Sequence, residues 1–301
     1  MEGTERLGRH REVRLDAGTI RYREVGSGPP IVFVHGLLVN GALWRLVVPS
    51  LAARYRCIVP DLPLGGHQPA MPSDADLSPG GLARLVADLL TALDVHDVTL
   101  VGSDTGGAIC QLVIAHSPQR VGRLVLTNCD AYEHWPPPLV LPFKWGAYVP
   151  GFVAALAHAL RFAPVRHALY GLLAKRRPES AVFHAFFAPL RDDPAVRWDV
   201  TKVLRGVINR ATLEAAKAFP RFRKPVLIVW GTDDPVFPMR DAVRLQRDFP
   251  LARLEWVLGS RCFVCEDQPE RLAALIAEFL RETRGLPESA PDRPVPVAGV
   301  A

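Results

Sequence analysis

Asp104 occupies the centre of a turn of the type that presents a nucleophile. The turn, 102–106, reads Gly-Ser-Asp-Thr-Gly and directly follows the apolar run 98–101. A Gly-x-nucleophile-x-Gly turn between a strand and a helix puts its central residue on a sharp, strained bend, and the flanking glycines let the backbone pass without a clash. Most such turns carry Ser. A carboxylate instead attacks an sp3 carbon bearing a strained oxygen or a leaving group, which gives an ester of the protein.

Apolar runs and helical spacing alternate on both sides of this turn. A hairpin is predicted at 11–24, buried strands are predicted at 31–34 and 57–60, and further strands are predicted at 98–101, 123–126, 225–230 and 253–257. Helices are predicted at 42–55, 82–93, 107–116, 240–248 and 269–281. Strands that alternate with helices in this way indicate an α/β fold with a doubly wound, mostly parallel sheet.

The periodicity changes between the two groups of strands. From Asp130 to about Phe219 the chain has proline clusters and helical segments but no convincing buried strand. We therefore predict a helical cap at 131–219, inserted into a core made of 1–130 and 220–284. The end of the chain, 285–301, is rich in Pro and small residues, which is typical of disorder.

Three signals together resemble the α/β-hydrolase fold over about 11–284, and within it the group of epoxide hydrolases and haloalkane dehalogenases. His-Gly-Leu follows the strand at 31–34, Asp stands in the 102–106 turn, and Gly-Thr-Asp-Asp-Pro follows the strand at 225–230. The resemblance implies that Asp104 is the nucleophile. It further implies that the backbone N–H groups of Leu37 and Thr105 form an oxyanion hole.

The resemblance also implies an acid and a base, and here the sequence departs from the family. Asp234 is the expected acid, with Asp233 as its rival. The family places its His base in a segment that reads Gly-Ser-Arg-Cys-Phe at 259–263, so Cys262 stands at the base position. A thiol has a pKa near ~8.5, which a carboxylate such as Asp234 raises further, so Cys262 is a poor base at neutral pH.

One residue is a candidate to replace the missing histidine, and another is a rival for the acid. No His follows His184 in the chain. His134, at the start of the predicted cap, could act as a substitute base. Asp130 follows the strand at 123–126, where some relatives carry the acid. The second half of a hydrolytic cycle depends on such a substitute.

The substrate is expected to be a small apolar molecule bound between cap and sheet. Dehalogenases of this group resemble one another in carrying side-chain N–H donors that bind halide, one after His-Gly and one after the nucleophile. Leu37 and Thr105 stand at these two positions and have no side-chain N–H, which disfavours a dehalogenase. Epoxide hydrolases use cap tyrosines, for which Tyr132, Tyr148 and Tyr170 are available. The residues expected to line the pocket are His35, Trp135, Tyr148, Tyr170 and Phe187, with His35 otherwise a structural hydrogen-bonding residue under the oxyanion loop.

Composition excludes several classes of partner. The positive charge is spread over scattered Arg side chains, which does not fit a nucleic-acid footprint. No run reaches the ~18 apolar residues of a membrane span, so we expect no membrane partner. Five cysteines, an odd number, indicate a reducing cytoplasm and no disulfide framework. Cys262-x-x-Cys265 lacks the four ligands of zinc, so no metal and no cofactor are expected.

Three functions remain open. The first is an epoxide hydrolase-like enzyme that acts through Asp104. The second is a cyclase, isomerase or lyase in which Asp104 is a general acid/base. The third is a non-catalytic ligand-binding protein. The oligomeric state is left open by the sequence.

Overall fold

One mixed sheet organises the chain. The computed structural model describes residues 5–284. Its sheet has eight strands in the order β1-β2-β4-β3-β5-β6-β7-β8. The strands are β1 (His10–Leu15), β2 (Gly18–Val25), β3 (Pro30–Val34), β4 (Arg56–Pro60), β5 (Val98–Asp104), β6 (Val121–Cys129), β7 (Val226–Gly231) and β8 (Ala252–Val257).

The direction of the strands confirms the predicted doubly wound, mostly parallel sheet. β1 and β2 form the predicted antiparallel hairpin, and β2 pairs antiparallel with β4. All other neighbours are parallel, from β4 through β3 and β5 to β8. Every residue of β5 is buried, because helices cover both faces of the sheet here. Because β3, β5, β6 and β7 are parallel, their carboxyl ends meet at one edge of the sheet.

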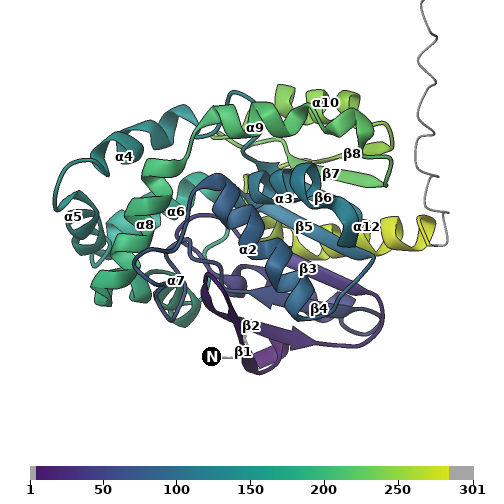
Figure 1. Ribbon diagram of the computed structural model, residues 1–301. Helices are drawn as coiled ribbons and strands as arrows, with labels where there is room; N and C mark the ends of the chain where they lie inside the picture. The colour runs from purple at the N-terminus through teal and green to yellow at the C-terminus, as the bar shows by residue number, and fades with distance from the viewer. Residues whose placement is uncertain (1–4, 285–301) are drawn as a thin grey trace, which may run out of the picture.

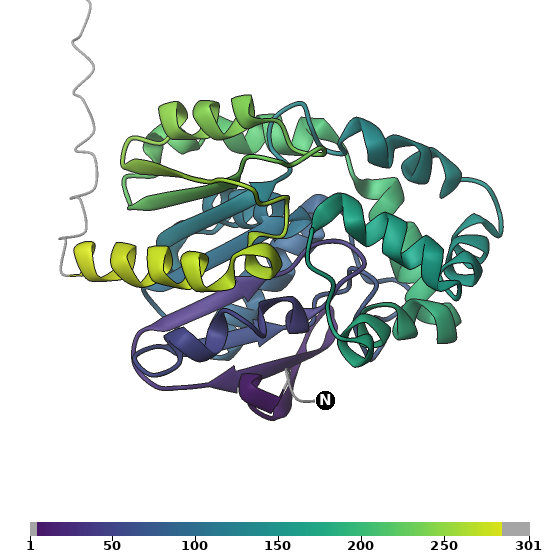
Figure 2. The ribbon, with the colours of Figure 1, turned by 180° about the vertical axis from the view of Figure 1, so that it is seen from behind.

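The helices of this part of the chain flank the sheet on both sides (Figures 1 and 2). The long ones are α2 (Pro79–Ala92), α3 (Thr105–His116), α10 (Met239–Asp248) and α12 (Pro269–Glu282). Short helices are η1 (Glu5–Leu7), η2 (Gly41–Trp44), α1 (Val48–Leu51), η3 (Pro118–Arg120), η5 (Phe219–Arg221) and α11 (Val264–Asp267). The predicted helix at 42–55 is wrong: η2 and α1 replace it, since Pro49 has no N–H to continue the hydrogen-bonding of a helix.

A helical insertion, residues 131–219, connects β6 to β7. It contains η4 (Pro138–Val140), α4 (Leu141–Gly146), α5 (Phe152–Ala159), α6 (Ala163–Leu173), α7 (Ser180–Asp192), α8 (Pro194–Gly206) and α9 (Asn209–Ala216). Helices α4 to α8 lie beyond one end of the sheet, and α9 packs against α3 (Figure 1). The division into core and cap stays a prediction, and the predicted disordered tail lies outside the described residues. Among residues 5–284, no helix is long and apolar enough to cross a membrane.

Candidate functional site

Asp104 is held in a strained backbone conformation at the junction of β5 and α3. Its φ is +55° and its ψ −134°. Such a conformation costs about 1–3 kcal/mol in a residue with a side chain and persists only where the surroundings fix it. Close packing fixes it here: a Cβ added at Gly106 would lie 2.5 Å from the carbonyl oxygen of His35, and one at Gly102 would lie 2.7 Å from that of Gly106. The turn can therefore be made only with glycine at both flanks.

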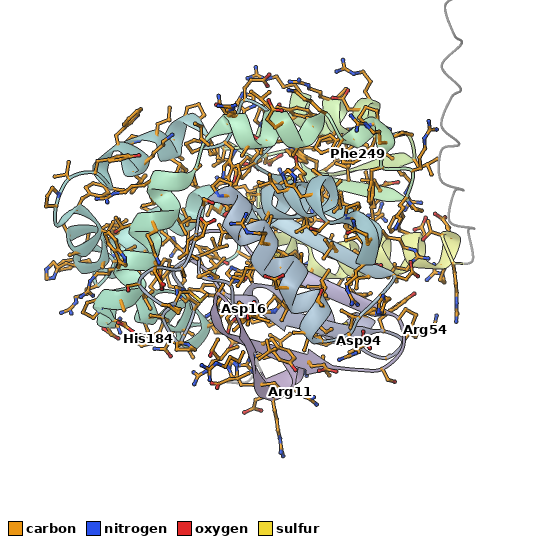
Figure 3. All side chains as sticks on the ribbon, in the orientation of Figure 1. Arg11, Asp16, Arg54, Asp94, His184 and Phe249 are labelled. Atoms are coloured by element: carbon orange, nitrogen blue, oxygen red, sulfur yellow. The ribbon has the colours of Figure 1, made fainter. Side chains whose placement is uncertain are left out.

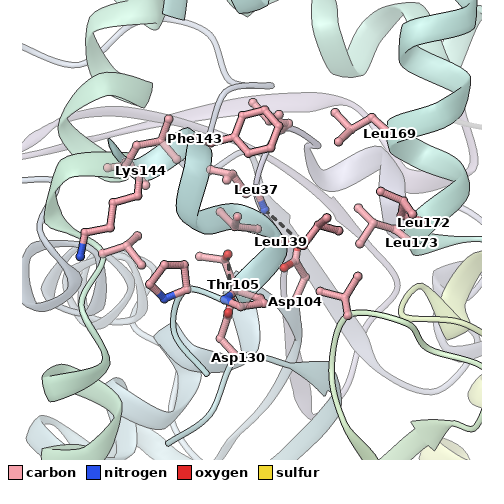
Figure 4. Close-up of a pocket in the computed structure, with 18 of the residues that line it drawn as sticks. Leu37, Asp104, Thr105, Asp130, Leu139, Phe143, Lys144, Leu169, Leu172 and Leu173 are labelled. Carbon is pink, nitrogen blue, oxygen red and sulfur yellow. Dashed lines mark hydrogen bonds between the residues drawn. The ribbon is translucent and has the colours of Figure 1, made fainter. Parts of the chain in front are cut away.

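The carboxylate of Asp104 lies against the loop that follows β3. The backbone N–H of Leu37 donates a hydrogen bond of 3.2 Å to Oδ2 of Asp104, drawn as a dashed line in Figure 4. Gly36 leaves the space for this contact, because a Cβ there would lie 2.6 Å from Cγ of Asp104. The amide predicted to form half of an oxyanion hole thus already binds one oxygen of Asp104.

Burial dominates the ionisation of Asp104. It raises the pKa of this carboxyl to about 7, while the backbone amides of Thr105 and Leu37 lower it and the nearby charge of Asp234 raises it. Burial disfavours the charged form, and hydrogen bonds to the carboxylate favour it. Asp104 is therefore a carboxyl that titrates near neutral pH.

A second carboxyl, that of Asp130, lines the same cavity as Asp104. Asp130 follows β6, and the hydroxyl of Thr105 donates a hydrogen bond of 3.1 Å to its Oδ2. Its Oδ1 is buried without a hydrogen-bond partner in residues 5–284, although Asp130 lines the cavity described below. Burial, and then the charge of Asp104, raise the pKa of Asp130 well above its ordinary range. Burial with so little hydrogen bonding favours the protonated form of this carboxyl.

Asp234 lies after β7 and is fixed by three donors. Its Oδ1 accepts the backbone N–H of Val236 (2.7 Å) and of Phe237 (3.2 Å), and its Oδ2 accepts Nδ2 of Asn128 (2.7 Å). Burial raises the pKa of Asp234 to about 6, although these three hydrogen bonds lower it. The rival acid, Asp233, is half-exposed and pairs with Lys175, so Asp234 is the carboxyl that faces the interior.

Cys262 is fully buried beside these acids. Its Sγ lies 3.7 Å from the carbonyl oxygen of Asn128, to which the thiol donates. Burial, followed by the charges of Asp234 and Asp104, raises the pKa of the Cys262 thiol well above its ordinary value. A thiol in this setting stays protonated. Asn128 also pairs through Oδ1 with the N–H of Gly231 at 2.6 Å, a role that sequence reasoning missed.

An apolar cavity of about 100 Å³ opens over Asp104 (Figure 4). Asp104, Thr105 and Asp130 lie at its base, and side chains of the insertion form most of its walls. Of the residues predicted to line it, Trp135, Tyr170 and Phe187 do so. Its size and lining suit a small apolar molecule.

The other two predicted pocket residues are placed elsewhere, which corrects the sequence interpretation. His35 is fully buried under the loop: its Nε2 accepts the N–H of Leu62, and its Nδ1 lies 2.9 Å from the carbonyl oxygen of Gly36. Burial lowers its pKa to about 4, so the ring is neutral and structural. Tyr148 is 54% exposed, and its hydroxyl donates to the carbonyl oxygen of Arg205.

The hydroxyl of Tyr170 is bound to a buried ion pair. Arg45 and Glu266 form two hydrogen bonds of 2.5 and 2.9 Å, and the Tyr170 hydroxyl donates to Oε1 of Glu266 at 3.0 Å. Tyr132 donates to Asp248 in the same manner. With Tyr148 also bound, each of the three candidate tyrosines already has an acceptor for its hydroxyl.

Two histidines of the insertion, His134 and His184, lie away from the site. Nδ1 of His134 lies 2.7 Å from Asp241, and its Nε2 lies 2.8 Å from Arg240. His134 does not line the cavity, which removes the geometric support for a substitute base there. His184, the last histidine of the chain, lies exposed on α7 (Figure 3).

The fold agrees with a family comparison. A family model described as alpha/beta hydrolase fold matches residues 29–267. The chain belongs to the alpha/beta hydrolase fold family. The catalytic roles expected for the loop after β3, for Asp104 and for the acid after β7 stay predictions.

Relatives in this family are named for different reactions. A 2-hydroxymuconate semialdehyde hydrolase from Pseudomonas sp. (strain CF600) is 30% identical over 266 residues, which are 85% of this chain and 88% of the relative. Haloalkane dehalogenase 2 from Mycobacterium bovis (strain ATCC BAA-935 / AF2122/97) is 28% identical over 276 residues, with coverage of 87% and 91%. The solved epoxide hydrolase CorEH has a TM-score of 0.77 at 20% identity, with coverage of 92% and 99%, and shows the fold alone.

Proposed function

We propose that this alpha/beta hydrolase hydrolyses small apolar epoxides through a covalent ester on Asp104. The observation that carries the proposal is the hydrogen bond from the Leu37 amide to Oδ2 of Asp104. In a serine hydrolase the oxyanion hole receives an oxygen of the substrate. Here a carboxylate oxygen of the protein fills that position, which disfavours attack on a carbonyl substrate and favours attack on an sp3 carbon by the other oxygen, Oδ1.

In the first step, Oδ1 of ionised Asp104 attacks an epoxide carbon. The carbon–oxygen bond of the ring breaks, and its electron pair moves to the epoxide oxygen. Asp130, which retains its proton, donates that proton to the developing alkoxide. The support for this role is that Asp130 lines the cavity and that its buried Oδ1 has no hydrogen-bond partner in residues 5–284, whereas the three tyrosine hydroxyls are already bound. The products are a hydroxyalkyl ester on Asp104 and an Asp130 carboxylate.

In the second step, the Asp130 carboxylate replaces the missing histidine. It takes a proton from water while the resulting hydroxide attacks Cγ of Asp104. The negative charge then develops on Oδ2, where the amides of Leu37 and Thr105 stabilise it. Collapse of this intermediate expels the diol oxygen, which takes up the proton carried by the new carboxylic acid. Asp104 ends as a carboxylate and Asp130 as an acid, so the cycle closes.

Cys262 is proposed to take no part in proton transfer, because its thiol stays protonated. Asp234 is proposed to act on Asp104 through its charge, which raises the pKa of the nucleophile. This assignment differs from the expectation in which Asp234 and a base at 262 form a catalytic pair. It places on Asp130 both the protonation of the epoxide oxygen and the removal of a proton from water.

A second candidate function follows from the same pair of carboxyls. An ionised Asp104 beside a protonated Asp130 is an acid/base pair that could isomerise or cyclise a bound substrate without forming an ester. The absence of a histidine base favours this alternative, since no water would need to be activated. The two candidates differ in whether a covalent adduct forms.

Mass spectrometry of the protein after exposure to 1,2-epoxyhexane separates them. We expect a rapidly quenched sample to gain the mass of the epoxide on the peptide that contains Asp104, with diol released later. Asp104→Asn should fold normally and gain no mass. Product without an adduct would favour the acid/base alternative. Unmodified protein without any product would exclude both reactions on this substrate and favour a ligand-binding role.

A further inference from the structure

The outer surface of the insertion is rich in exposed apolar side chains. Nine of the fourteen large apolar side chains that are exposed among the described residues belong to residues 131–219. Trp145 is 64% exposed, Tyr148 54% and Trp198 45%. Large aromatic side chains that lie exposed next to one another are typical of a surface that binds a protein, a membrane or a ligand.

These aromatic side chains form one continuous face with two cations. The rings of Trp145 and Tyr148 lie 6.4 Å apart. Arg205 lies over the rings of Tyr148 (5.3 Å) and Trp198 (5.7 Å), and Lys144 lies 5.6 Å from the ring of Trp145. We call these five residues, from α4, the turn after it and α8, the aromatic face. Its rings and cations are interleaved, so it is both apolar and positive.

The segment that supplies Lys144, Trp145 and Tyr148 to this face carries basic residues and no carboxylate. Residues 134–178 include no Asp and no Glu. The six basic residues of this segment are Lys144, Arg161, Arg166, Lys175, Arg176 and Arg177. The segment therefore adds positive charge to the insertion, which is complementary to a negatively charged surface, although Lys175 is paired with Asp233.

Helix α4 connects the aromatic face to the cavity. Phe143 and Lys144 line the cavity, as Figure 4 shows, whereas Trp145 next to them is exposed. Leu139, one turn earlier, lines the cavity and is itself 47% exposed. If the aromatic face is docked on a surface, an apolar molecule that leaves that surface therefore has a short apolar route into the cavity.

We propose that the aromatic face docks the protein on an anionic lipid bilayer. Its Trp and Tyr rings suit the headgroup region, where one part of the ring is in an apolar setting and the other is hydrated. The basic side chains suit the phosphates of anionic lipids. The expectation of no membrane partner was drawn from the lack of a spanning segment, and peripheral docking needs none. The proposal goes beyond the epoxide reaction and does not depend on it.

Sedimentation of the full chain with lipid vesicles tests the proposal. We expect binding to vesicles with about 30% phosphatidylglycerol, weak binding to pure phosphatidylcholine, and release by about 0.5 M NaCl. Trp145→Ser with Trp198→Ser should lower the affinity about tenfold or more. The matched control, Leu251→Ser with Leu258→Ser, changes two side chains that are exposed outside the insertion and should bind as the unchanged protein does.

Quenching of tryptophan fluorescence by brominated lipids locates the contact. Trp145→Phe should remove much of the quenching, whereas Trp256→Phe, at an exposed position on β8, should not. Absence of binding to both kinds of vesicle, or equal effects of the two substitutions, would overturn the proposal. A dimer in light scattering that Trp145→Ser dissociates would also overturn it, because the face would then belong to a second copy of the chain.

Discussion

Asp104 and Asp130 line the same cavity, but backbone amides contribute to the hydrogen bonding of Asp104 in particular. Backbone amides of Leu37 and Thr105 stabilise the ionised form of Asp104, whereas Asp130 accepts a hydrogen bond from the Thr105 hydroxyl and leaves Oδ1 without a partner in the described chain. Charge repulsion disfavours ionisation of both at once. The amides therefore direct the negative charge to Asp104 and the proton to Asp130, and this difference supplies the nucleophile and the acid of the proposed cycle.

Asp130→Asn tests the proton donor. Asn keeps the size and can still accept the Thr105 hydroxyl, but it donates no acidic proton. We expect ester formation from an epoxide to slow by about 10²–10⁴-fold. Alkylation of Asp104 by a primary alkyl tosylate, whose leaving group needs no proton, should change little. Rapid-quench mass spectrometry measures both rates, and equal losses with the two reagents would point to a structural effect of the substitution.

Gly36→Ala tests the position of the Asp104 carboxylate. The added Cβ would lie 2.6 Å from Cγ of Asp104, so the carboxylate must leave the Leu37 amide. We expect turnover to be lost, with Tm changed much less than activity. Gly80→Ala in α2 is the control, because its nearest neighbour beyond that helix's own backbone is the end of the Arg84 side chain at 3.6 Å. Wild-type turnover in Gly36→Ala would show that the contact between Leu37 and Asp104 is dispensable.

The pH profile of kcat/KM should follow the ionisation of the Asp104 carboxyl. Burial raises its folded pKa to about 7, so the nucleophile is protonated below this value and ionised above it. Activity should therefore fall by about tenfold per pH unit below pH 7. Because the folded pKa is raised, the native state binds more protons than the unfolded state between the ordinary carboxyl pKa and 7, and stability should fall as pH rises through this window. Asp104→Asn should remove that part of the dependence; a profile flat from pH 5 to pH 8 would argue against an Asp104 nucleophile.

Cys262→His tests whether the site still accepts a histidine base. Residue 262 is fully buried, and its thiol is influenced by the charges of Asp234 and Asp104. An imidazole there would have a pKa suited to neutral pH and could activate water. We expect ester hydrolysis to speed up by about 10²-fold or more, seen as faster decay of the covalent adduct. Cys262→Ser is the control for a change in polarity alone; a matching acceleration in it would contradict the argument.

The buried pair of Arg45 and Glu266 should matter for stability. Arg45→Met would leave the Glu266 carboxylate buried with the Tyr170 hydroxyl as its remaining donor, which we expect to cost about 3–5 kcal/mol in the free energy of unfolding. Lys217→Met, which breaks an exposed pair with Glu214, should have little effect. Urea denaturation measures both, and a loss no larger than that of the surface variant would contradict the importance of the pair.

Local patterns predicted the parts of the fold that depend on neighbouring residues. Apolar runs identified β3 to β7, and the glycines around Asp104 identified the elbow, because a strand and a tight turn leave their signal in a few consecutive residues. The pairing of Arg45 with Glu266 joins positions 221 residues apart, and that of Asn128 with Asp234 joins positions 106 apart. No local pattern encodes such contacts. A polar Asn near the end of an apolar strand was the one available signal for Asn128.

The direction in which side chains point could also not be predicted from the sequence. The predicted pocket residues Trp135 and Phe187 face the cavity, whereas Tyr148 faces outward, although all three are aromatic residues of the insertion. His134 lies close to Asp130 in sequence, but its ring turns toward Asp241 on α10. These directions are decided by how the insertion packs on the sheet.

A single turnover in heavy-oxygen water, with the protein in excess over 1,2-epoxyhexane, tests the central claim most directly. If Asp104 forms the ester, the oxygen that opens the ring comes from its carboxylate, so the first diol contains no heavy oxygen from water. The heavy oxygen should instead appear in the peptide that carries Asp104. A first-turnover diol that carries heavy oxygen, with an unlabelled Asp104, would mean that water attacks the epoxide directly and that no ester forms.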